Sequence, residues 1–341
     1  MKRLSSILVA GMLAVAVAAC GGASGGLGSV PTAAPVASDQ PGGPDLTPSP
    51  SGPTTPSSAP SETPVSTPAI DPTAKPGSTA TPGTTAKPAV TPAPAATTIV
   101  RAYFVLGGEL RSQGLVPVLR EVRETTAVAR AAMNALLAGP TAAESGERTV
   151  TSAIPTGTRL LGVSIKNGIA TVDLSTEFDS GGGSTSMAYR LAQVVYTLTQ
   201  FSTVKSVTFQ IEGTTVTVFG GEGLILDGPQ ARDDYFDQLP AIFVDRPAYG
   251  AAIGNPGRVA GNANVFEATF RVALIDAAGS TLVDEMVMAT CGTGCRGTFD
   301  ISLRYKVAKS QWGTLRAYNL SANDGTPEAI RDYPVWLTPG G

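Results

Sequence analysis

Two of the three cysteines, Cys291 and Cys295, lie close together in the stretch ATCGTGCRGTFD. A structural zinc site needs four ligands, mostly Cys and His, and the sequence contains no histidine. A thioredoxin-type redox pair has two residues between its cysteines and lies at the start of a helix. This pair has three and lies between strand-like runs, so we favour a structural disulfide over free thiols and over metal or redox chemistry. The stretch predicts a staple at the tip of a hairpin.

Ser202 and Lys205 have the spacing of the serine and lysine of some acyl-enzymes. That chemistry needs the serine at a helix start, the lysine one turn later and a second catalytic motif. Here the pair follows a predicted helix and leads into a predicted strand, and neither Ser-Asp-Asn nor Lys-Thr-Gly comes after it. We interpret the spacing as chance.

Three closely spaced carboxylates, Asp173, Glu177 and Asp179, could form an acid/base pair or a calcium ligand set. The plainer interpretation is a strand end followed by a solvated turn. Without histidine, acid–base chemistry would rest on carboxylates, Lys or Tyr alone. We therefore predict no enzyme, no metal site and no cofactor, with a carboxylate-dependent cell-wall hydrolase as the alternative.

The first residues are typical of a bacterial export signal. Lys2 and Arg3 precede an apolar run over 4–19, which is shorter than the roughly 20 residues that a spanning helix needs. The run ends in Val-Ala-Ala before Cys20, which resembles a lipobox, in which the cysteine is lipidated. We predict a signal peptide at 1–19 and a lipid anchor on Cys20, with an ordinary secretory signal or an uncleaved anchor as alternatives. Export would place the chain in an oxidising compartment, which favours the disulfide.

Residues 20–98 have the composition of a disordered linker. Most of the 27 prolines lie there among Ser, Thr, Ala and Gly, and no Phe, Trp or Tyr precedes Tyr103. Such a stretch cannot bury enough apolar surface to offset its ordering entropy. We expect a tether that holds the folded part away from the membrane, with a proline-rich ligand for a partner domain as the alternative.

The formal net charge is −3, and we find no cluster of Lys and Arg in the folded part. Proteins that bind nucleic acid need clustered cations to displace counterions. We therefore expect no nucleic-acid partner.

The segment 99–230 predicts an α+β domain, a sheet with two helices on one face. Apolar runs divided by turns predict strands, and Asn167-Gly168 between two alternating runs predicts a hairpin. Helical spacing of apolar residues predicts one helix capped by Thr125 or Thr126 and another over 185–201. Strands and helices in the order ββαββαββ are typical of this class.

The segment 241–338 predicts an all-β immunoglobulin-like sandwich. It contains about seven short strand-like runs divided by Gly, Asn, Asp and Pro turns, a spacing typical of sandwiches. One such turn, SANDGT at 321–326, lacks the ligand spacing of a calcium loop and predicts a hairpin.

Both segments resemble known families. The first is similar to the GerMN domain, named for the sporulation and germination protein GerM, in the motifs AYFVLGGELRSQGLVPVLREV, ALLAGPTAAE, SAIPTGTRLLGVSIKNGIATVDLSTEF, LAQVVYTLTQF and FGGEGLILD. The second is similar to the immunoglobulin-like Gmad domain in RPAYG, VAGNANVFEATFRVALID, TCGTGCRGTF and SANDG. These resemblances imply an assembly or interaction module of exported lipoproteins, without assigned catalytic residues.

We therefore expect a non-catalytic, extracytoplasmic lipoprotein that binds an envelope protein, a cell-wall polymer or a second copy of itself. An accessory lipoprotein of a membrane sensor kinase is a further alternative. The expected contact surface is the polar stretch 177–189, and a mobile loop is the plainer interpretation of it. Its candidate residues are Glu177, Asp179, Gly181, Gly182, Gly183 and Tyr189.

Overall fold

The computed structural model describes residues 96–108, 112–146 and 149–340. The predicted signal peptide, the lipid anchor at Cys20 and nearly all of the predicted linker lie outside these residues. Within the described part, no helix is long and apolar enough to cross a membrane.

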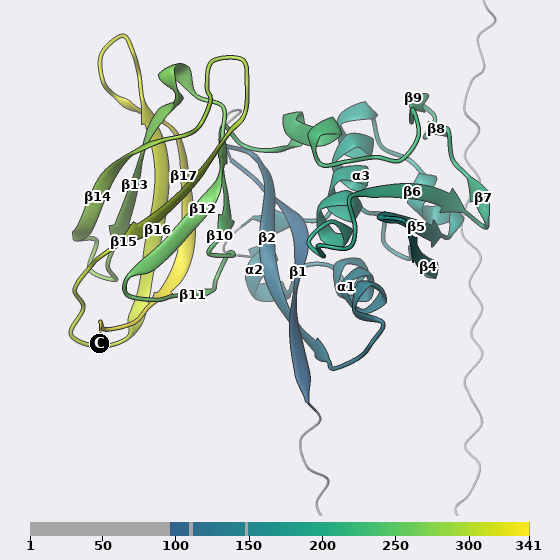
Figure 1. The fold of residues 1–341 in the computed structure, drawn as a ribbon, viewed down its shortest axis with the longest axis horizontal. Coiled ribbons are helices and arrows are strands. Elements are labelled where there is room, and N and C mark those ends of the chain that lie inside the picture. Colours follow the sequence, from purple (N-terminus) through teal and green to yellow (C-terminus); the bar gives the residue numbers. More distant parts are fainter. Residues whose placement is uncertain (1–95, 109–111, 147–148, 341) are drawn as a thin grey trace, which may run out of the picture. The chain divides into compact units, whose positions relative to one another are not determined.

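The first module is an α+β fold, as predicted (Figure 1). Its helices are α1 Val128–Leu137, α2 Ala142–Gly146 and α3 Ser184–Leu198, with short 3-10 turns η1 Thr176–Asp179 and η2 Asp233–Gln238. Its strands are β1 Thr97–Leu106, β2 Gly114–Arg123, β3 Val150–Thr151, β4 Leu160–Lys166, β5 Ile169–Leu174, β6 Ser206–Ile211, β7 Thr214–Thr215, β8 Val218–Phe219 and β9 Leu224–Ile225.

These described strands form two main sheets rather than the single sheet that we expected. One sheet has the order β2-β1-β3, the other the order β4-β5-β6-β7, and β8 and β9 form a small ribbon. The predicted hairpin joins β4 to β5 through Asn167 and Gly168, both at positive φ. Strand β6 then pairs parallel to β5, because the chain crosses over through α3.

Helix α3 explains why the sheets stay separate, since its polar side chains occupy the edge of β1. The Gln193 amide donates to the Tyr103 carbonyl at 2.9 Å, and the Tyr103 N–H donates to the Thr197 hydroxyl at 3.1 Å. Gln200 makes the same kind of paired contact with the backbone of Arg101. Buried backbone groups must find partners, and here a helix supplies them in place of a strand.

Both predicted helices form, with shifted boundaries. The prediction that Thr125 or Thr126 caps α1 is wrong, because the position before the helix is Ala127 and makes no side-chain cap bond. Instead, the Thr125 hydroxyl accepts from the Ala127 N–H at 3.0 Å, which forms a local turn ahead of the helix.

The second module is an all-β sandwich, as predicted, with eight strands in the described part. They are β10 Ile242–Arg246, β11 Ala252–Ile253, β12 Gly257–Ala263, β13 Thr269–Ile275, β14 Thr281–Met288, β15 Gly297–Leu303, β16 Gln311–Leu320 and β17 Pro327–Leu337, with a 3-10 turn η3 at Phe266–Ala268. One sheet has the order β10-β12-β15 and the other β11-β17-β16-β13-β14. The predicted turn at 321–326 joins β16 to β17 in an antiparallel hairpin.

The described residues of the two modules belong to one compact unit and share buried contacts. Arg331 of β17 is 3% exposed and donates to the carbonyls of Ser112, Gly114 and Leu115 at the start of β2. Tyr103 of β1 donates to Asp245 of β10 at 2.6 Å. The polar network at this junction ties the first sheet to the sandwich.

Candidate interaction site

The segment 177–183 connects β5 to α3 and contains most of the predicted contact residues. Thr176–Asp179 forms the short turn η1, and the glycines 181–183 that follow are exposed. Gly182 has a φ of +87°, and a Cβ there would lie 3.2 Å from the Arg190 guanidinium. This position therefore suits glycine both for its conformation and for its close approach to Arg190.

Arg190 of α3 fixes the backbone of this segment through hydrogen bonds. Its side chain is 2% exposed, and its guanidinium donates to the carbonyls of Phe178, Ser180 and Gly181. Burial lowers the pKa of Arg190, and the nearby Asp179 carboxylate opposes this shift. Three hydrogen bonds to one buried side chain give the exposed segment a defined shape, which argues against a freely moving loop.

A pocket of about 520 Å³ opens where this segment enters α3. Gly183 and Tyr189, both predicted, line it together with the hydroxyls at 184–186. Its other wall comes from Val105, Gln113 and residues 151–153, which the sequence analysis did not single out. Burial raises the pKa of Tyr189, which keeps its hydroxyl a neutral hydrogen-bonding group.

The predicted carboxylates do not converge on one site. Asp173 accepts a hydrogen bond from the Gly213 N–H at 2.9 Å, and Asp179 accepts one from the Gly220 N–H at 2.6 Å. A hydrogen bond from Ser175 lowers the pKa of Glu177, which is half-buried. Two of the three thus hold turns of the backbone, and among the described residues no group of three His, Cys, Asp or Glu side chains could hold a metal ion.

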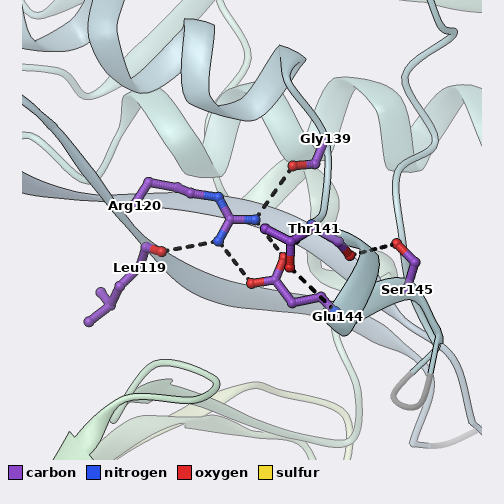
Figure 2. A network of polar contacts seen from close by, with 6 residues as sticks. All are labelled: Leu119, Arg120, Gly139, Thr141, Glu144 and Ser145. Carbon is purple, nitrogen blue, oxygen red and sulfur yellow. Dashed lines mark hydrogen bonds and ion pairs between the residues drawn. The ribbon is translucent and has the colours of Figure 1, made fainter.

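The motif ALLAGPTAAE forms a capping network around α2 (Figure 2). The Thr141 N–H donates to Glu144 at 2.7 Å, and the Glu144 N–H donates to the Thr141 hydroxyl at 3.4 Å, which is a capping box. Arg120 of β2 binds both Glu144 oxygens, at 2.9 and 2.7 Å, and contacts the Gly139 carbonyl. Burial alone would raise the pKa of Glu144, but the bonds from Arg120 and Thr141 outweigh it and lower the pKa. This motif therefore has a structural role.

Cys291 and Cys295 lie in the connection between β14 and β15, with Cα atoms 5.9 Å apart and the two sulfurs joined. The predicted position at a hairpin tip is wrong, because β14 and β15 belong to opposite sheets of the sandwich. The connection crosses from one sheet to the other, so the two cysteines tighten a crossover loop.

Ser202 and Lys205 lie between the end of α3 and the start of β6, as the sequence indicated. The Lys205 N–H donates to the Gly168 carbonyl at 2.7 Å, which places this turn against the β4–β5 hairpin. The serine is therefore not at a helix start, where acyl-enzyme chemistry needs it.

The folds and sites described so far define an α+β module joined to an immunoglobulin-like sandwich, without a converging catalytic set among the described residues. Residues 101–217 match the family model Germane, described as sporulation and spore germination. Residues 241–326 match Gmad2, described as the immunoglobulin-like domain of bacterial spore germination. The chain therefore contains a GerMN-like domain followed by a Gmad2 immunoglobulin-like domain.

Solved structures with a similar region include the first GerMN domain of the sporulation protein GerM from Bacillus subtilis, at 23% identity. That match covers 40% of this chain and 100% of the other, with a TM-score of 0.35. The tandem GerMN domains of the same protein match at 16% identity over 61% of this chain and 62% of the other, with a TM-score of 0.35. A putative lipoprotein from Clostridium perfringens matches at 20% identity over 40% of this chain and 89% of the other, with a TM-score of 0.29. No curated protein matches the chain.

Proposed function

We propose that this chain is an extracytoplasmic, lipid-anchored binding or assembly module of the cell envelope, related to sporulation or germination. The observation that carries the proposal is the fixed presentation of residues 181–189 beside the pocket at the start of α3. A buried arginine already fixes this exposed backbone segment. The segment therefore loses little conformational entropy when it binds a partner. The occupant is an envelope protein, a wall polymer or a second copy of this chain.

The geometry also favours binding over carboxylate catalysis. Asp173 and Asp179 each accept a backbone N–H from a different turn. A pair of glycosidase carboxylates would instead face each other across a substrate. The family matches are to sporulation and germination domains, which is consistent with a binding role.

Crosslinking in intact cells tests the proposal. The Thr185→Arg variant places a large cation on an exposed residue of the pocket rim and leaves the Arg190 contacts in place. Thr214→Arg, on exposed strand β7, is the matched control because it adds the same side chain elsewhere in the module.

We expect the wild type and Thr214→Arg to capture the same partner, and Thr185→Arg to lose it at an unchanged melting temperature. Identical crosslinks from Thr185→Arg and the wild type would show that the surface lies elsewhere. Recovery of no partner from cells, combined with hydrolysis of peptidoglycan by the purified protein, would favour the enzyme alternative.

A further inference from the structure

One end of the sandwich carries a depression of about 640 Å³ that no family match explains. It is lined by the loop between β15 and β16, by Asn255 and Pro256 before β12, and by Gly340. The loop alternates between exposed Arg304, buried Tyr305 and exposed Lys306. In an extended segment, alternate residues point to the same side, so both cations face away from the core.

This loop is firmly held. The Asn255 side-chain amide donates to the Tyr305 backbone carbonyl at 2.6 Å, and the Tyr305 N–H donates back to Oδ1 of the same Asn255 side chain at 3.4 Å. The Tyr305 hydroxyl donates to the Ile253 carbonyl at 2.9 Å and accepts the Thr338 N–H at 3.0 Å. The backbone that carries the two cations is therefore bonded to the segment 253–255 and to Thr338.

The depression has the opposite charge to the whole chain. The formal net charge is −3, yet the described lining of the depression contains Arg304 and Lys306 and no Asp or Glu. Exposed Lys309 follows in the same loop. Within the described residues, none of the three forms an ion pair. In the sequence the three cations do not form a continuous run, because apolar residues separate them.

An aromatic pair lies at the same end of the sandwich. Trp312 of β16 and Trp336 of β17 are direct cross-strand partners, with ring centroids 5.3 Å apart, and Trp312 is 48% exposed. Trp312 is three residues beyond Lys309 in the chain. Trp336 pairs with Ala252 of β11, the strand that leads to Asn255 (Figure 1).

The outer face of β16 and β17 continues from the tryptophans with polar groups. Arg316 and Asp332 are cross-strand partners joined at 2.7 Å, with side chains 39% and 43% exposed. Tryptophan is enriched among the residues that contribute most of the energy at binding surfaces. Its flat apolar ring stacks on the apolar face of a sugar, while charged and amide groups bind hydroxyls and anions.

We propose that this end of the sandwich binds an anionic polysaccharide. The rings of the polymer stack on Trp312, and its carboxylate or phosphate groups bind the cations of the 304–309 loop. The inference rests on the proposed envelope role, because such polymers lie outside the cytoplasm. The proposed polysaccharide site is a different surface from the pocket at α3, so experiments can refute either proposal and leave the other standing.

The test is titration of the full-length protein with an oligogalacturonate and with its fully methyl-esterified form, which has the same rings without charge. We expect the acid form to bind about tenfold more tightly than the ester at low salt, and added salt to remove the difference. The double variant Arg304→Gln/Lys306→Gln should lose most of this preference for the acid form and keep only the part that Lys309 supplies. Trp312→Ala should weaken both forms by about tenfold, since it removes stacking and leaves the charges in place.

Arg130→Gln/Lys166→Gln is the matched control, because it removes the same charge from exposed positions of the first module. Equal affinity of the wild type for acid and ester, or unchanged discrimination in Arg304→Gln/Lys306→Gln, would overturn the proposal. Binding to phosphatidylglycerol vesicles in place of the oligosaccharide would also overturn it and indicate a membrane surface. Unchanged crosslinking by Thr185→Arg, together with oligosaccharide binding by the wild type, would refute only the surface at α3.

Discussion

Replacing Arg190 by methionine should lower the free energy of unfolding by about 2 kcal/mol. The carbonyl of Phe178 is buried with the guanidinium, so its loss of a charged donor costs about 1–3 kcal/mol. The carbonyls of Ser180 and Gly181 belong to exposed residues and can bind water instead, so they add little. Removing a buried cation that has no hydrogen-bonded acidic partner recovers part of this cost.

Thermal unfolding followed by circular dichroism measures the change. For a folded part of this size, about 2 kcal/mol corresponds to a melting temperature roughly 4–8 °C lower. Hydrogen exchange gives the local signature, because the amides of residues 178–183 should exchange faster when the clamp is gone.

Arg130→Met is the control, since Arg130 is an exposed residue of α1 and its replacement should change stability by less than about 0.5 kcal/mol. An Arg190→Met protein that melts with the wild type, with unchanged exchange at 178–183, would refute the clamp. A loss of stability without faster local exchange would show that Arg190 supports the core and not the exposed segment.

Four further predictions follow from single positions. Glu144→Gln should lower the free energy of unfolding by about 1 kcal/mol at neutral pH. Because the pKa of Glu144 is lowered in the folded state, the wild type should keep this full advantage above the unfolded pKa and lose it as the pH falls through the folded pKa. Denaturant titrations of both proteins at several pH values measure the difference. Gly114→Ala should destabilise by more than about 2 kcal/mol, since φ is +152° and a Cβ would lie 2.6 Å from the Pro240 nitrogen; a calorimetric melting temperature equal to that of the wild type would contradict this. Non-reducing peptide mapping should recover Cys291 bonded to Cys295, and Cys291→Ser should cost roughly 2 kcal/mol; two free thiols in protein from the cell surface would exclude the bond. Cys20→Ala should abolish labelling by a fatty-acid analogue in cells, and equal labelling of the wild type and the variant would exclude a lipid anchor.

The sequence predicted those parts of the fold that depend on local patterns. The hairpin at Asn167 and Gly168 formed because both residues tolerate positive φ, and the apolar stripe of α3 is buried as its spacing indicated. The apolar spacing did not predict that the polar residues Gln193 and Thr197 of α3 are fully buried. A polar residue inside an apolar helix pattern has no local partner, so its position could not be explained until β1 was known to lie beside it.

The candidate sites also depend on contacts between segments that are far apart in the sequence, and these contacts could not be predicted. The glycines at 181–183 suggested an exposed turn, but the residue that shapes it, Arg190, lies a helix turn or more further along and looks like an ordinary solvent-facing cation in the sequence. The cations of the 304–309 loop and Trp312 were equally inconspicuous, because only the register of β16 on β17 pairs Trp312 with Trp336. The role of a buried arginine or an exposed tryptophan can therefore be inferred only when the neighbouring strand or helix is known. For this reason, variants at Arg190 and at Trp312 are more informative tests of binding than variants at the carboxylates that first drew attention in the sequence.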